Sequence, residues 1–302
     1  MTSQYQRHAL LLIGMVLYWP GTFQEFCLIL ERWAYFRCNH SVSPDASQSS
    51  MLEAREKLLP LMKKSICGSS WRKDSKYYVL GKGRPLGAVD LSPAWFQQGH
   101  DVSASVHELY SFDRWLISNQ RISQQYPQAS VSLRDSSASD WLDSISESNA
   151  VVSAILAVIH PKLYDAGRKT ADLLRVTPQV GAQDILRRWA SVFSGVSVIS
   201  NRITKPHRDL GSRFNWYDIL ATSGTYEKCT LELPSLGISL EYGTGSVVGI
   251  LGKVLTHEVR TFEGDRVCYA YFMRDKVHDW ARVPCSDWMC ISHYDSTYSD
   301  QT

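Results

Sequence analysis

A short charged stretch in the C-terminal half of the chain carries the residue types of a metal site. His207 and Asp209 are separated by one residue within "NRITKPHRDLGSRFNWYD", residues 201–218. Alternate side chains of a β-strand point to the same face, so a His-x-Asp on a strand presents an imidazole and a carboxylate side by side. Two ligands do not complete a site, and an ordinary charged turn has the same composition.

A second histidine supplies a third ligand. His257 lies further along the chain in "VLTHEV", which alternates like a strand. Two neutral imidazoles and one carboxylate form the facial triad of non-haem Fe(II) oxygenases, which leaves the other coordination positions open. A bidentate 2-oxoacid and O2 can fill those positions. The combination of His207, Asp209 and His257 therefore predicts an Fe(II) site that uses a 2-oxoacid and O2.

A cation follows the last of these ligands. Arg266 lies in "GDRVCYAYF", soon after His257. Arginine offers a carboxylate two parallel donors, which lysine cannot do. Taken singly, His257 could be a hydrogen-bonded core residue and Arg266 a surface ion-pair partner. Together with His207 and Asp209 they favour a site for a 2-oxoacid with a second carboxylate, which Arg266 would bind.

The region around these residues has the pattern of a β-rich fold. From about residue 188, short alternating or apolar segments are separated by glycine-containing turns; they are "WASVFSGVSVIS", "CTLEL", "GISLEY", "SVVGIL", "VLTHEV" and "RVCYAYFM". Six or more short strands in this space predict an antiparallel sandwich or barrel. The first half has mainly helical periodicity, so the fold class is α+β, with helices bracing one face of the sheet.

The first half of the chain divides into apolar-periodic and polar segments. Helices are predicted over 9–37, 51–66 with a kink at Pro60, 105–118 and 140–174. The connections are predicted to be a polar linker over 39–50, a short strand over 77–80 and an exposed loop over 122–140.

Composition limits the class of protein. The 302 residues carry a net charge of +2, which gives no general basic footprint for nucleic acid. Seven cysteines at irregular spacing, without a CxxC, argue against a disulfide framework or a structural zinc and favour a reducing compartment. The apolar run 9–19 is too short to span a bilayer and lacks the cleavage site of a secretory signal, so we predict a buried helix and no membrane association.

Three longer segments resemble a known family. They are "SNRITKPHRDLGSRFNWYDIL", "LPSLGISLEYGTGSVVGILGKVLTHEV" and "GDRVCYAYFMRDKVH". Over about residues 185–280 the chain is similar to the TET/J-binding-protein group of Fe(II)- and 2-oxoglutarate-dependent oxygenases, especially its compact fungal members. The resemblance implies a double-stranded β-helix, or jelly-roll, flanked by helices that come mainly from the N-terminal half. We expect one integrated domain over 1–302, with a helical bracing region (1–175), a β-helix core (176–282) and a C-terminal tail (283–302).

The resemblance also implies roles for single residues. The iron ligands fall on His207, Asp209 and His257, and the 2-oxoglutarate arginine falls on Arg266. Arg202 matches an arginine near the cofactor or base, and Phe272 matches an aromatic that stacks on the base. Where some members have a base-contacting histidine, this chain has Arg274. The methylated base therefore stays open between 5-methylcytosine, N6-methyladenine and thymine.

The family's members oxidise a methyl group on a base flipped out of duplex DNA, so methylated duplex DNA is the expected partner, with a monomeric protein in the nucleus. Candidate DNA contacts are Lys205, Arg208, Arg213 and Trp216. The alternative explanation is a solvated charged loop for the basic residues and a core position for Trp216. Two alternatives remain: a 2-oxoglutarate oxygenase acting on protein or a small molecule, and a non-catalytic DNA-binding module.

Overall fold

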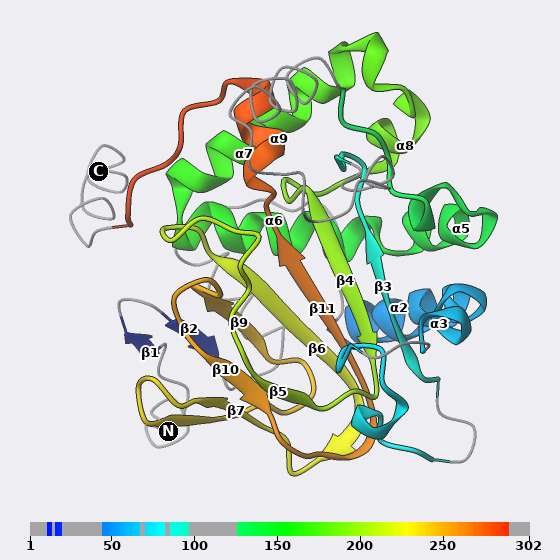
Figure 1. Ribbon diagram of the computed structural model, residues 1–302, viewed down its shortest axis with the longest axis vertical. Helices are drawn as coiled ribbons and strands as arrows, with labels where there is room; N and C mark the ends of the chain where they lie inside the picture. Colours follow the sequence, from blue (N-terminus) through cyan, green and yellow to red (C-terminus); the bar gives the residue numbers. More distant parts are fainter. Residues whose placement is uncertain are drawn as a thin grey trace, which may run out of the picture.

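Two antiparallel sheets and a layer of helices form the molecule in the computed structural model (Figure 1), which describes residues 11–13, 16–19, 44–66, 70–81, 85–96 and 126–289. The larger sheet has the strand order β1-β2-β9-β6-β11-β4-β3, and the smaller one has the order β5-β10-β7-β8. All pairs of named strands in both sheets are antiparallel.

The chain alternates between the two sheets from residue 195 onward. In the larger sheet lie β4 (Gly195–Ser200), β6 (Asp218–Glu227), β9 (Val247–Ile250) and β11 (Glu263–Phe272). In the smaller sheet lie β5 (Thr204–His207), β7 (Thr230–Leu233), β8 (Ile238–Glu241) and β10 (His257–Val259). Eight strands interleaved in this way are a jelly-roll. The α+β class and the jelly-roll core predicted from the sequence are confirmed.

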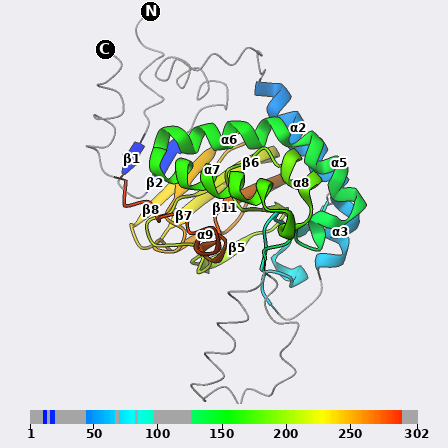
Figure 2. The same ribbon diagram turned by 90° about the horizontal axis from the view of Figure 1, so that it is seen from above.

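Helices cover the outer face of the larger sheet, as Figure 2 shows from above. They are α2 (Pro44–Lys57), α3 (Leu59–Ser65), α5 (Ser136–Ser144), α6 (Ser146–Ile159), α7 (Pro161–Val176), α8 (Gln183–Arg188) and α9 (Asp275–Ala281). α2, α3 and α5 come from the N-terminal half, α6 spans the middle of the chain, and α7 follows directly, so most of the helices precede the β-rich region, as expected. The break between α2 and α3 at Leu58 confirms the kink predicted near Pro60, and α5, α6 and α7 confirm the helices predicted over 140–174.

Strand β11 separates two apolar cores. Val267, Tyr269 and Tyr271 belong to the core between the sheet and the helices, whereas Cys268 belongs to the core between the two sheets. Because side chains alternate along a strand, the even-numbered residues of β11 all face away from the helices. The same alternation directs Asp218 and Leu220 of β6 to the inner side of the sheet, while Ile219 packs under the helices.

Three strands of the larger sheet come from the N-terminal region. β1 (Leu11–Ile13) and β2 (Val16–Trp19) pair with each other, and β2 pairs with β9, so the predicted helix over 9–19 is wrong there. Short apolar runs fit a strand or a helix equally well, and here the partner is a distant strand edge. The rest of the predicted 9–37 helix and the 105–118 helix lie outside the described residues. β3 (Gly87–Leu91) pairs with β4 at the other edge and was not predicted.

Three connections also differ from the sequence prediction. α2 begins at Pro44 inside the predicted 39–50 linker, because proline suits the first turn of a helix. α5 begins at Ser136 inside the predicted 122–140 loop, where Asp135 caps it by accepting a hydrogen bond from the Ser137 amide. Residues 77–80 form only an isolated bridge at Tyr78 with Arg202.

In the described part of the chain, no single helix has both the length and the apolar character to cross a membrane. The consecutive helices α5 and α6 reach that length and composition only as a pair, bent by 59°. The division of the chain into a bracing region, a core and a tail stays a prediction.

Candidate metal centre

The two histidines of the predicted site meet where β5 and β10 pair. His207 ends β5, His257 begins β10, and the two residues are partners across the antiparallel pair. Their ring centroids lie 4.3 Å apart. Strand pairing, rather than proximity in the chain, therefore brings these two imidazoles together.

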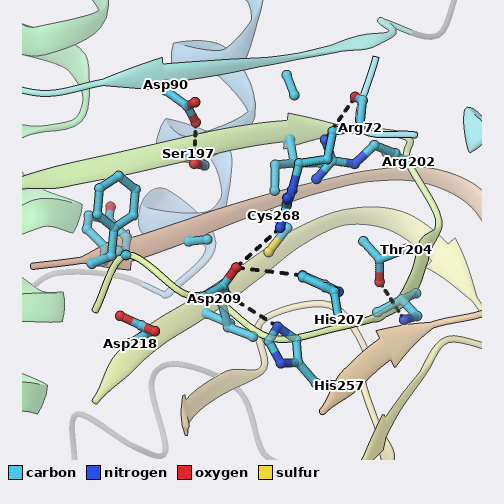
Figure 3. A pocket seen from close by; sticks show the side chains of 18 of the residues that line it. Arg72, Asp90, Ser197, Arg202, Thr204, His207, Asp209, Asp218, His257 and Cys268 are labelled. Carbon is cyan, nitrogen blue, oxygen red and sulfur yellow. Dashed lines mark hydrogen bonds and ion pairs between the residues drawn. The ribbon is translucent and has the colours of Figure 1, made fainter. Parts of the chain in front are cut away.

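Asp209 completes the cluster from just beyond the end of β5. Its carboxylate lies 3.8 Å from His207 Nε2 and 3.4 Å from His257 Nε2, as the dashed lines in Figure 3 show. One ligand atom from each of the three residues lies within 4.8 Å of the others. The prediction placed Asp209 on the strand with His207, but the strand has already ended. Its backbone N–H instead donates to the Gly252 carbonyl at 2.8 Å, which fixes this turn.

Backbone carbonyls orient both imidazole rings. His207 Nδ1 lies 2.8 Å from the Lys205 carbonyl, and His257 Nδ1 lies 3.1 Å from the Leu255 carbonyl. A carbonyl can only accept, so each Nδ1 carries a proton, and Nε2 is the nitrogen whose lone pair a metal would use. Both lone pairs belong to the atoms nearest Asp209. Metal-bound histidines in proteins are oriented by the same kind of second hydrogen bond.

The electrostatics suit ligands in their metal-binding forms. Burial, together with the neighbouring His257, lowers the pKa of His207 to about 4, so its ring is neutral at neutral pH. Burial alone would raise the pKa of the Asp209 carboxyl, but His257, His207 and Arg72 lower it below its usual range. Together with the imidazole of His257, the cluster thus offers two histidine nitrogens and one carboxylate, a donor set that fits Fe(II).

Arg266 lies on β11 within the same cavity, which has a volume of about 550 Å³. The side chain is buried, with its guanidinium carbon 4.9 Å from the centroid of the Tyr242 ring and 5.6 Å from that of Phe262. Among the described residues it forms no ion pair, and its Nε has no hydrogen-bond partner. A buried cation without a carboxylate partner is suited to bind an anionic ligand that enters the cavity.

A hydrogen-bonded chain ties the backbone of Arg266 to helix α2. Arg55 of α2 donates to both oxygens of Asp265, at 2.7 and 2.9 Å. Asp265 accepts from the Asn201 side chain at 2.7 Å, and Asn201 Oδ1 accepts from the Arg266 N–H at 2.8 Å. The N-terminal half therefore braces the position of Arg266.

Arg202 lies in the cavity wall, where the loop between α3 and β3 covers it. Its Nη1 donates to the Arg72 carbonyl at 3.1 Å, and its guanidinium carbon lies 5.3 Å from the Trp71 ring centroid. Trp71 also packs edge-on against His207, with centroids 5.2 Å apart, and Arg72 reaches Asp209 at 3.4 Å. The sequence prediction missed Trp71 and Arg72; the run "SSWRKDSKYY" has the aromatic and basic residues that could have drawn attention to them.

The predicted base-contacting residues line the same cavity as the metal cluster. Phe272 and Arg274 both line it, and the Arg274 guanidinium stacks on the Phe272 and Trp95 rings. Asp218 of β6 also lines this cavity and was missed as well, although a carboxylate that opens an apolar strand is an unusual signal.

The other predicted DNA-contacting residues do not all lie at the cavity. Arg208 is exposed and lines the cavity. Lys205 is exposed, 5.0 Å from the Tyr77 ring centroid. Arg213 forms ion pairs with Asp275 and Asp279 of α9, outside the cavity lining, and covers the buried Trp216. The structure therefore does not bring Arg213 or Trp216 to the cavity.

Comparison with a family model identifies the family of this chain. The family model Tet_JBP, described as the oxygenase domain of the 2OGFeDO superfamily, matches residues 121–275, about half of the chain. One solved structure, NgTET1 in complex with 5mC DNA, is 16% identical with a TM-score of 0.39; the alignment covers 57% of this chain and 64% of that one. No curated protein matches the chain. The chain belongs to the Tet_JBP family and is an oxygenase of the superfamily that uses Fe(II), 2-oxoglutarate and O2.

Proposed function

We propose that this protein oxidises the methyl group of a methylated base that is flipped out of duplex DNA. The observation that carries the proposal is that one cavity is lined by two kinds of residue. It is lined by His207, Asp209, His257 and Arg266, and also by Phe272 with further polar groups. Phe272 offers a ring for stacking and the polar groups offer hydrogen bonds, which are what a flipped base needs.

In this proposal the residues that line the cavity have separate roles. His207, Asp209 and His257 hold the metal, and Arg266 binds the distal carboxylate of 2-oxoglutarate, with Arg202 close by. Bound Fe(II), with 2-oxoglutarate and O2, supplies the oxidising chemistry that turns a methyl C–H into C–OH while 2-oxoglutarate becomes succinate and CO2. Trp71 and the buried walls limit the access of water, and Phe272 orients the base.

The rim of the cavity supports a polyanionic partner. Arg72, Lys73 and Arg208 line it and are exposed, and Lys76 and Lys205 lie beside it over the Tyr77 ring. The net charge of the whole chain is only +2, so this basic rim is a local feature. Contacts between such cations and DNA phosphates increase the affinity for DNA, and this contribution falls steeply as the salt concentration rises.

The test is mass spectrometry of nucleosides after incubating the protein with methylated duplex DNA, Fe(II), ascorbate and 2-oxoglutarate. We expect hydroxymethylated base from a methyl on carbon, or formaldehyde and unmodified base from a methyl on nitrogen, together with succinate. The Asp209→Asn protein serves as the inactive control. Production of succinate without any modified nucleoside would reject the DNA substrate and favour an oxygenase that acts on protein or a small molecule.

Binding gives an independent test of the same proposal. Affinity for methylated duplex should fall strongly between low and physiological salt, and Arg208→Ala should reduce that salt dependence. Identical salt dependence for Arg208→Ala and wild type would remove Arg208 from the DNA contact. We further propose a nuclear location, which rests on the DNA substrate alone.

A further inference from the structure

Asp218 is a buried carboxyl group with no hydrogen-bond partner that faces the cavity. It opens β6, is 3% exposed, and lines the same cavity as the metal cluster, as Figure 3 shows. Neither carboxyl oxygen has a hydrogen-bond partner among the described residues. The Ser212 hydroxyl favours the ionised carboxyl, but it does not form a hydrogen bond with it. An unsatisfied buried carboxyl is costly to fold, so a ligand that satisfies it is the natural explanation.

The position of Asp218 relative to the metal cluster follows from Gly252. A Cβ atom on Gly252 would lie 2.4 Å from Asp218 Oδ2 and 3.3 Å from Asp209 Oδ2. Both carboxylates therefore face the same small space above this glycine. A substrate held by Asp218 would lie next to the metal ligand Asp209, where a methyl group must be to react.

Arg274 provides hydrogen-bond donors on the same wall. Its guanidinium carbon lies 3.9 Å from the Trp95 ring centroid and 4.8 Å from that of Phe272, so two rings fix its orientation. Its Nε has no hydrogen-bond partner among the described residues. Burial lowers the pKa of Arg274, and the nearby carboxylates of Asp90 and Asp218 counteract this effect. The wall thus pairs an acceptor, Asp218, with a group that can only donate.

This pair matches the edges of some bases and conflicts with others. The Watson–Crick edge of 5-methylcytosine has an amino donor beside the N3 acceptor, and that of N6-methyladenine has an N–H donor beside the N1 acceptor. Thymine has the opposite order, with the O4 acceptor beside the N3–H donor. A carboxyl oxygen accepts from an amino group whether or not the carboxyl is protonated, whereas Arg274 cannot accept the N3–H of thymine.

We propose that Asp218, acting with Arg274, selects methylated bases that carry an exocyclic amino group, and that it discriminates against thymine. The inference rests on the proposed function, because it names the class of base that the same cavity accepts. Asp218 determines specificity by accepting the amino hydrogen, and Phe272 supplies the stacking surface.

The experiment compares wild type with Asp218→Asn on three duplexes of one sequence that carry 5-methylcytosine, N6-methyladenine or thymine at one target position. Relative kcat/KM is measured by nucleoside mass spectrometry, and affinity by equilibrium binding with Mn(II) and without 2-oxoglutarate. Wild type should prefer an amino-bearing base over thymine. Asparagine can donate to O4, so Asp218→Asn should reduce this preference about tenfold or more in both measurements.

Two further variants serve as controls. Asp165→Asn removes an exposed carboxylate of α7 that does not line the cavity, so its base preference should equal that of wild type. Asp218→Ala removes the acceptor without adding a donor, and should weaken binding of the amino-bearing duplexes while leaving the thymine duplex unchanged. Thermal unfolding of each variant checks that the fold is intact, since Asn and Ala relieve rather than create an unsatisfied charge.

The outcomes separate this inference from the function on which it rests. Equal preference in wild type and Asp218→Asn, or efficient oxidation of thymine by wild type, overturns the role of Asp218 and leaves DNA oxidation standing. Conversion of 2-oxoglutarate to succinate without modification of any duplex overturns the proposed function, and this inference with it.

Discussion

His207 and His257 are register partners across the antiparallel pair β5–β10, with ring centroids 4.3 Å apart. A pair of strands thus presents two imidazoles to the carboxylate of Asp209. Because the strand ladder sets the distance between the rings, the cluster is formed by the fold before any metal binds, which favours metal binding.

Loss of one ligand should abolish turnover and weaken metal binding. We expect Asp209→Asn and His257→Ala to show no measurable conversion of 2-oxoglutarate to succinate, because two ligands do not hold Fe(II) in an active geometry. Bound iron after dialysis is the second measurement. Asp165→Asn, an exposed carboxylate on α7, is the matched control and should behave as wild type. Full activity in His257→Ala with normal iron content would exclude His257 as a ligand.

Arg266 should determine the requirement for 2-oxoglutarate. Arg266→Lys keeps the charge but loses the two parallel donors, so the KM for 2-oxoglutarate should rise roughly tenfold to a hundredfold. Steady-state kinetics with 2-oxoglutarate as the varied substrate measures this. Arg260→Lys changes an exposed arginine that pairs with Glu258 and should have no effect. An unchanged KM in Arg266→Lys would mean that the distal carboxylate binds elsewhere.

The ion pair between Arg55 and Asp265 should matter for both stability and cosubstrate binding. Arg55→Met leaves Asp265 without its two strongest donors, and breaking such a buried pair costs about 3 kcal/mol. Urea denaturation measures the loss, and the KM for 2-oxoglutarate should also rise, because Asp265 and Asn201 support Arg266. Lys228→Met, which removes an exposed partner of Glu263, should change neither quantity.

Acid should destabilise the protein through its buried histidines. Burial lowers the pKa of His278 to about 4, against about 6.5 in the unfolded chain. Between these values the unfolded state binds more protons, so stability falls as the pH drops from about 6.5 to about 4. Over this pH range, the protonation of His278 lowers the free energy of unfolding by roughly 3 kcal/mol. Denaturation of metal-free protein at several pH values measures the slope, which should be shallower in His278→Gln. An equal slope would place the pH dependence in other groups.

The residue types in the sequence were enough to predict the metal cluster. Features that depend on contacts between distant parts of the chain, such as strands β1 and β2 and the site of Asp218, could not be predicted from them. His207, Asp209, His257 and Arg266 have side chains whose chemistry is specific enough to be found without a structure. Asp218 acquires its significance only from burial and from its position near Gly252, neither of which a local pattern contains. Likewise, β1 and β2 are strands because β9 offers them an edge, so their apolar run alone could not distinguish a strand from a helix.

The alternation of side chains along β11 determines what substitutions in this strand affect. Val267, Tyr269 and Tyr271 pack beneath the helices, while Arg266, Cys268, Ala270 and Phe272 line the cavity. Substitutions at the cavity-lining positions can therefore alter ligand preference, whereas those at Val267 and Tyr269 act mainly on stability. An insertion of one residue within β11 would turn the cavity-lining side chains toward the helices and the core side chains toward the cavity. Ligand binding and stability would then be lost together.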